Sequence, residues 1–181
     1  TYKLNFGLVL QQMKELAADY NPNAKLAETL WKEETRELKI LATLLYPTNE
    51  YTKDIADRWV NEIPNQEIRE QICVNLFQHL PFARSSAIEW ANNADIEIRI
   101  TGYWLLARLF LSKRITEKIN INTLSYIWQD IATGDNIFLR NAAISILKHI
   151  GRQTQEDAQH ILDKLSVYKN DTETSKQEIY N

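Results

Sequence analysis

Basic side chains that could bind phosphate are concentrated in one stretch of this sequence. Between residues 99 and 152, eight arginines and lysines stand against three acidic residues, a net charge of +5, although the whole chain carries −3. The basic residues are Arg99, Arg108, Lys113, Arg114, Lys118, Arg140, Lys148 and Arg152. Such side chains neutralise DNA phosphates, so the stretch could form a basic surface on an acidic protein. A solvated face without a partner explains an isolated charge count of this size equally well.

Four basic residues also occupy one position of a repeated pattern, between an aliphatic residue and further small or apolar ones. They are Lys39, Arg69, Arg99 and Arg140. On a helix, Arg99 would lie beside Gly102 at the edge of an apolar stripe. A guanidinium placed there can hydrogen-bond a carbonyl or carboxylate of the neighbouring helix pair. We therefore weigh a structural role for Arg69 and Arg99 above a DNA contact, and we expect Gly102 to permit close helix packing.

Each of these basic residues follows, by four positions, a residue that can cap a helix. The capping residues are Thr35, Asn65, Asp95 and Asn136. Their side-chain oxygens can accept hydrogen bonds from the free N–H groups of a first helical turn. Glu37, Glu67 and Glu97 then fall in the first turn, where the helix dipole favours negative charge. The shared register predicts four equivalent helices.

Amphipathic segments around these starts predict the partner helices, at residues 8–20, 24–32, 51–62, 84–92, 118–133 and 154–168. Antiparallel helix pairs that repeat about every 30 to 47 residues are typical of HEAT-like proteins. The predicted fold class is all-α, a HEAT-like α-solenoid of antiparallel helix pairs, and the shared register disfavours an irregular bundle. We expect one such domain over residues 1–168 and a polar, disordered tail over 169–181. The abrupt start at Thr1 indicates a missing N-terminal part.

Other kinds of site find little support in the sequence. The single cysteine, Cys73, lies in an apolar helical pattern, which excludes a disulfide framework and a thiolate metal site. His79, His149 and His160 lack the spacing of paired metal ligands. The five tryptophans mostly fall on apolar stripes and are expected in the core. No apolar run approaches the roughly 20 residues that cross a bilayer. We expect a cytoplasmic protein without metal, cofactor or membrane partner.

Short motifs in the chain resemble those of a known family. "NFGLVLQQMKELA" at residues 5–17, followed by "LAETLWKEETRELKILATLLY" at 26–46, resembles the opening of the DNA alkylation repair proteins, the AlkD-like HEAT-repeat alkylpurine glycosylases. "ADIEIRITGYWLLARL" and "GDNIFLRNAAISILKHIGR" are similar to that family's third and last helical units. The resemblance covers nearly the whole chain. It implies cleavage of the N-glycosidic bond of a cationic alkylpurine in a concave DNA-binding groove.

The resemblance places the family's catalytic carboxylate at Glu70, with Gln66 where the family has a tryptophan. A carboxylate there could stabilise the positive charge that develops on the sugar as the base departs. The family's groove arginine aligns at Ile100, one residue from Arg99, and a groove tryptophan falls near Ser145. With the basic stretch, this predicts a set of DNA-contacting residues. They are Arg99, Lys113, Arg114, Arg140, Lys148 and Arg152.

Two functional hypotheses follow from these observations. The first is a DNA-binding HEAT-repeat protein, weak or inactive as an alkylpurine DNA N-glycosylase, whose ligand is duplex DNA, including alkylated or abasic duplex. The alternative is a protein-binding HEAT scaffold that holds a protein partner on its concave face and has no DNA function. The acidic overall charge and the missing groove aromatics favour this alternative.

Overall fold

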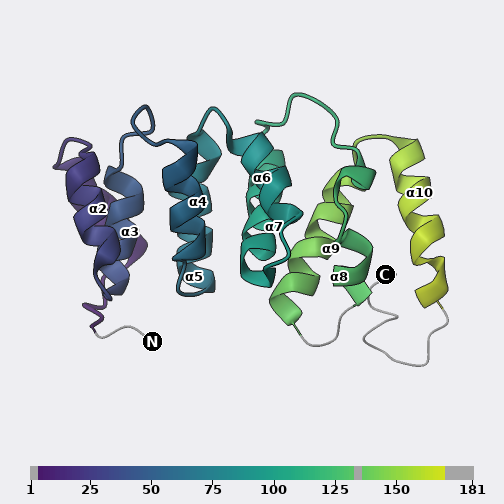
Figure 1. Ribbon diagram of the computed structural model, residues 1–181, viewed down its shortest axis with the longest axis horizontal. Coiled ribbons are helices and arrows are strands. Elements are labelled where there is room, and N and C mark those ends of the chain that lie inside the picture. Colours follow the sequence, from purple (N-terminus) through teal and green to yellow (C-terminus); the bar gives the residue numbers. More distant parts are fainter. Residues whose placement is uncertain (1–3, 133–135, 170–181) are drawn as a thin grey trace. The chain divides into compact units, whose positions relative to one another are not determined.

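The computed structural model describes residues 4–132 and 136–169 of the chain. These residues form helices joined by turns, and they fall into two compact units, Thr1–Ala83 and Arg84–Asn181 (Figure 1). The tail predicted at 169–181 lies outside the described residues from residue 170 onward. Within the described part, no helix is long and apolar enough to span a membrane. The all-α prediction is confirmed.

The first unit is built from successive helices and one short 3-10 turn. They are α1 (Leu10–Ala18), α2 (Ala24–Lys32), α3 (Arg36–Leu45), α4 (Lys53–Asn61), α5 (Gln66–Asn75) and η1 (Phe77–His79). Its core is aromatic. The rings of Trp31 and Trp59 stack with centroids 4.1 Å apart, and Tyr46 and Tyr51 meet Trp59 edge-on. The stacked rings of Trp31 and Trp59 join α2 to α4. Both rings are buried, so the predicted core position of these two tryptophans is confirmed.

The second unit contains the two longest described helices of the chain. Its elements are α6 (Ala83–Ala91), α7 (Ile96–Leu111), η2 (Ile121–Thr123), α8 (Ile127–Ala132), α9 (Ile137–Gly151), α10 (Gln155–Leu165) and η3 (Ser166–Tyr168). Gly102 lies where α7 meets α6, and a Cβ on it would stand 2.7 Å from the Ala91 Cα. The close helix packing expected of Gly102 is therefore confirmed.

Most of the predicted helix starts occur at the expected residues. Asn65, Asp95 and Asn136 cap α5, α7 and α9 and accept hydrogen bonds from first-turn N–H groups at 2.8 to 3.3 Å. Thr35 precedes α3, but its side chain makes no cap bond. Instead Glu37, only 1% exposed, accepts the N–H groups of Phe6 and Leu8 and fixes the segment before α1. Its role is a specific contact as well as a dipole effect.

The helix predicted at 118–133 is largely wrong. Residues 118–126 form an irregular segment around η2, and α8 starts only at Ile127. Asn120 accepts a hydrogen bond from the Asn122 N–H, and the Asn92 side chain binds the Thr123 carbonyl and the Ser125 N–H. The Asn120 side chain satisfies the backbone within the segment, and the Asn92 side chain does so from the end of α6; both kinds of bond compete with a helix.

Candidate nucleic-acid interface

Arg99, predicted both as a structural residue and as a DNA contact, lies in the interior of the second unit and is 4% exposed. Its Nε and Nη2 donate to the two carboxylate oxygens of Asp130 at 2.7 and 3.0 Å. Its Nη1 donates to the carbonyls of Asn93 and Ala94 at 2.8 and 3.1 Å. The fork joins α7 to α8 and to the turn before α7. Every guanidinium nitrogen is engaged, so the structural interpretation is confirmed and Arg99 offers nothing to a phosphate.

The carboxylate that holds Arg99 is itself fully enclosed. Asp130 is 1% exposed and accepts a further hydrogen bond from the Tyr103 hydroxyl at 2.8 Å. The Arg99 guanidinium also lies over the Tyr126 ring, 4.4 Å from its centroid. A buried ion pair of this kind is tolerated because each charge keeps several hydrogen-bond partners.

The equivalent residues of the first unit are also turned inward. Lys39, 9% exposed, donates from Nζ to the Trp31 carbonyl at 2.5 Å and lies over the Trp31 ring. Burial lowers the pKa of Lys39. Arg69 is buried and donates to the Gln66 side chain at 2.6 Å. Arg140 is half-buried, and residues 133–135, which precede its helix in the sequence, lie outside the described residues.

Basic residues gather at the opposite, C-terminal ends of α7 and α9. The two ends lie side by side in the second unit (Figure 1). The Phe110 and His149 rings join them, stacked in parallel with centroids 5.2 Å apart. Four of the predicted DNA-contacting residues occupy these ends and are exposed, and we call them the C-terminal basic cluster. They are Lys113, Arg114, Lys148 and Arg152.

Within the part of the chain that the structure describes, Lys113, Lys148 and Arg152 form no ion pair. Burial, and secondarily the charge of Arg152, lowers the pKa of the neighbouring His149, which favours its neutral form. Basic residues at helix C-termini also interact favourably with the helix dipole, so the location alone does not imply a ligand. The gathering of four exposed cations from two helices does provide a surface that matches a phosphate backbone.

The backbone of Lys113 marks this surface in a way that the sequence did not reveal. Its φ is +55°, in the left-handed region, while the Arg114 N–H donates to the Leu109 carbonyl at 2.9 Å to close the helix end. Glycine is usual at such a helix end, and another residue there costs about 1 kcal/mol or more. At Lys113 the chain bears this cost at a position where glycine would avoid it. No signal before the structure identified this position as left-handed.

Glu70, predicted as the catalytic carboxylate, lies half-buried on α5 of the first unit. It accepts a hydrogen bond from the Gln66 amide at 3.0 Å. Glu67, one turn earlier, is bound by the Arg36 guanidinium at 2.6 Å. The partner of the Glu70 carboxylate is therefore an uncharged amide, whereas the Glu67 carboxylate is paired with an arginine. A carboxylate held in this way could stabilise a developing cation.

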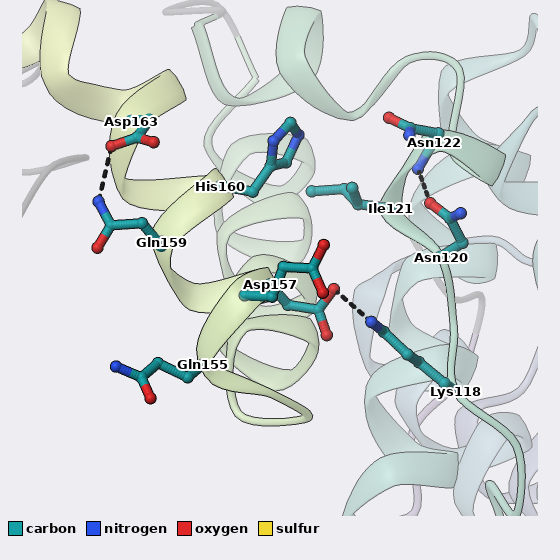
Figure 2. A pocket seen from close by; sticks show the side chains of 10 residues that line it. Lys118, Asn120, Ile121, Asn122, Gln155, Asp157, Gln159, His160 and Asp163 are labelled. Atoms are coloured by element: carbon teal, nitrogen blue, oxygen red, sulfur yellow. Dashed lines mark hydrogen bonds and ion pairs between the residues drawn. The ribbon is translucent and has the colours of Figure 1, made fainter.

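A polar hollow of about 720 Å³ lies between α10 and residues 118–122 (Figure 2). Lys118 binds Asp157 across it at 2.9 Å, and Gln159 donates to Asp163 at 2.7 Å (Figure 2). The hollow is lined by three carboxylates and one ammonium group, those of Glu156, Asp157, Asp163 and Lys118. Its net charge is therefore negative and would repel phosphate. Among the described residues, no group of three or more His, Cys, Asp or Glu side chains could hold a metal ion.

Comparisons with known proteins identify the family of this chain and a solved structure with a similar fold. The family model described as "DNA alkylation repair enzyme" matches residues 3–178. A solved structure, described as "A new family of proteins related to the HEAT-like repeat DNA glycosylases with affinity for branched DNA structures", superposes with a TM-score of 0.75. It is 14% identical, and the match covers 98% of this chain and 81% of that one. The chain therefore has the predicted HEAT-like solenoid fold. No curated protein matches the sequence.

Proposed function

Because this chain belongs to the DNA alkylation repair enzyme family, we propose that it binds DNA by its phosphate backbone through the C-terminal basic cluster. The observation that carries the proposal is the gathering of Lys113, Lys148 and Arg152 at adjoining helix ends of the second unit, where all three are exposed and form no ion pair with any described residue. Arg114 and the half-buried Arg140 extend the set. Arg99 is left out because its guanidinium is buried and each of its nitrogens already donates to Asp130 or to a backbone carbonyl.

Family membership and the structural neighbour both favour DNA as the ligand. The neighbour's description names affinity for branched DNA, and the family's description names alkylation repair. We include alkylated and abasic duplexes among the forms of DNA that the protein binds. The backbone contacts are common to all of these, because phosphate recognition carries no sequence information.

The direct test measures DNA affinity as a function of salt concentration. The variant Lys148→Ala/Arg152→Ala loses two phosphate contacts. The negative slope of log K against log[salt] on duplex DNA should therefore become shallower by about 1.8. The charge-matched control is Lys14→Ala/Lys25→Ala, which removes two exposed lysines of the first unit. The control should keep the wild-type slope. An equal loss in both double variants would show only a dependence on net charge and would refute the site.

A second function, residual excision of alkylated purines, is favoured by the state of Glu70. Its carboxylate accepts a neutral amide donor, and no described arginine or lysine forms an ion pair with it. In the proposed reaction the bond between the sugar C1′ and the purine nitrogen breaks, and its electrons leave with the cationic base. Glu70 stabilises the sugar cation, water then adds to its C1′, and the proton that this water loses passes to the solvent.

The length of the Glu70 side chain limits the expected rate. One methylene more than aspartate can shift the carboxylate by about 1 Å, which can cost about a hundredfold. The measurement is release of methylated purine from alkylated duplex DNA by the wild type, Glu70→Gln and Glu70→Asp. We expect slow release by the wild type and none by Glu70→Gln. Equal release by the wild type and Glu70→Gln would remove Glu70 from the reaction, and no release by any variant would leave DNA binding alone.

A further inference from the structure

Apolar and aromatic side chains stand beside the C-terminal basic cluster along α7 and α9, and a phosphate backbone would not use them. Leu111, the last residue of α7, is 64% exposed and lies two residues from Lys113. Phe110 and His149 stack in parallel between the two helix ends, and each is partly exposed. Lys148 and Arg152 stand beside His149 in the sequence of α9 and its cap.

The arrangement joins two kinds of recognition on one small surface. The cations attract the sugar-phosphate chain, while exposed leucine and ring surfaces gain free energy when a flat apolar group covers them. In an intact duplex the base faces are stacked on each other and cannot reach these side chains. A base without a partner presents its face, and stacking on protein rings beside a basic groove is the usual way to hold it.

We infer that the DNA held at the C-terminal basic cluster contains unpaired nucleotides, with a base lying against Leu111 and the Phe110–His149 stack. The inference rests on the proposed function and specifies its substrate class. The charge of the surface favours this occupant over an apolar peptide, because Lys113, Lys148 and Arg152 each lie within three residues of Leu111 or His149, are exposed, and form no ion pair with any described residue. The acidic hollow beside α10 offers no such site, since its carboxylates would repel the backbone.

The experiment compares two labelled DNA molecules that share the same double-stranded sequence, by fluorescence anisotropy. One is a complete duplex, and the other carries a single-stranded flap. We expect the wild type to bind the flap DNA about tenfold more tightly than the duplex, in keeping with one stacked base. In Leu111→Ser and in His149→Ala the ratio of the two affinities should fall towards one. His149→Phe keeps a ring in place and should retain the preference.

The matched control is Leu162→Ser on α10, which removes a leucine that is 45% exposed and lies outside the cluster. Leu162→Ser should keep the wild-type ratio, and circular dichroism should show native helix content in every variant. Equal affinity of the wild type for flap and duplex would overturn the inference and leave the proposed function standing. An unchanged ratio in both Leu111→Ser and His149→Ala would also overturn it. Failure of the wild type to bind either DNA would overturn the proposed function, and the inference with it.

Discussion

At the N-terminal end of α7, Arg99 is buried, and its guanidinium nitrogens bind Asp130 and two backbone carbonyls. At the C-terminal end of the same helix, Lys113 is exposed and forms no ion pair with any described residue. The two cations lie fourteen positions apart in the basic stretch and count equally towards its charge. The difference shows that a count of basic residues overestimates the positive charge available to a ligand. Some of the counted residues, such as Arg99, belong to ion pairs that hold helices together.

The sharpest way to break the comparison is to remove the buried cation. Arg99→Met leaves Asp130 without its main partner in the interior, and we expect a loss of about 3 to 5 kcal/mol in the free energy of unfolding, measured with urea. Arg99→Met/Asp130→Asn should recover part of the loss because the unpaired charge is gone. A loss below about 1 kcal/mol in the single variant would contradict the assigned role of this pair.

A second prediction concerns the contact that positions α7. Gly102→Ala should destabilise the protein by about 2 to 3 kcal/mol, because the new Cβ would meet the Ala91 backbone, which cannot move aside cheaply. Thermal unfolding followed by circular dichroism measures this effect. Gly151→Ala is the matched control, since its Cβ would stand 3.5 Å from the end of the Ile161 side chain, an ordinary contact. If both variants unfold at the wild-type temperature, the close approach does not constrain the helices.

The equivalent position in the first unit sharpens the comparison. Lys39 binds a carbonyl and, among the described residues, no carboxylate, so Lys39→Met leaves no described buried charge unpaired, and we expect a loss within about 1.5 kcal/mol. Burial lowers the pKa of Lys39 below its ordinary 10.5. Between those two pKa values the unfolded chain binds more protons at this position. Wild-type stability should therefore rise relative to Lys39→Met as the pH rises towards 10.5. Urea titrations across that range measure it, and a falling difference would contradict the sign.

The smallest effect is expected at Lys113, where stability and binding should change in opposite directions. Lys113→Gly relieves the left-handed backbone and should stabilise the fold by about 0.5 to 1 kcal/mol. The same variant loses one phosphate contact, so the salt slope of DNA binding should fall by about 0.9. Lys113→Gln separates the two effects, because it removes the charge and keeps the backbone cost. Stabilisation by Lys113→Gly without weaker DNA binding would show that the lysine has no role in the interface.

Local signals were sufficient for much of the fold. Asn65, Asp95 and Asn136 set the starts of α5, α7 and α9 because a cap acts within one helical turn. Local signals did not predict the irregular segment at residues 118–126. There the Asn92 side chain, some thirty residues earlier in the chain, binds the Thr123 carbonyl and the Ser125 N–H. Contacts over such a separation have no signature in the local pattern.

The sequence by itself determined the all-α class, the register of the repeated helices and the residues of the basic stretch. Only the tertiary structure decided which cations are available. Asp130 encloses Arg99, the Phe110–His149 stack brings two helix ends together, and the end of α7 puts Lys113 in a left-handed conformation. The physical reason is that charge and helix propensity are properties of single residues and their near neighbours. Burial and the sharing of a surface depend on residues far apart in the chain, which meet only when the helices pack.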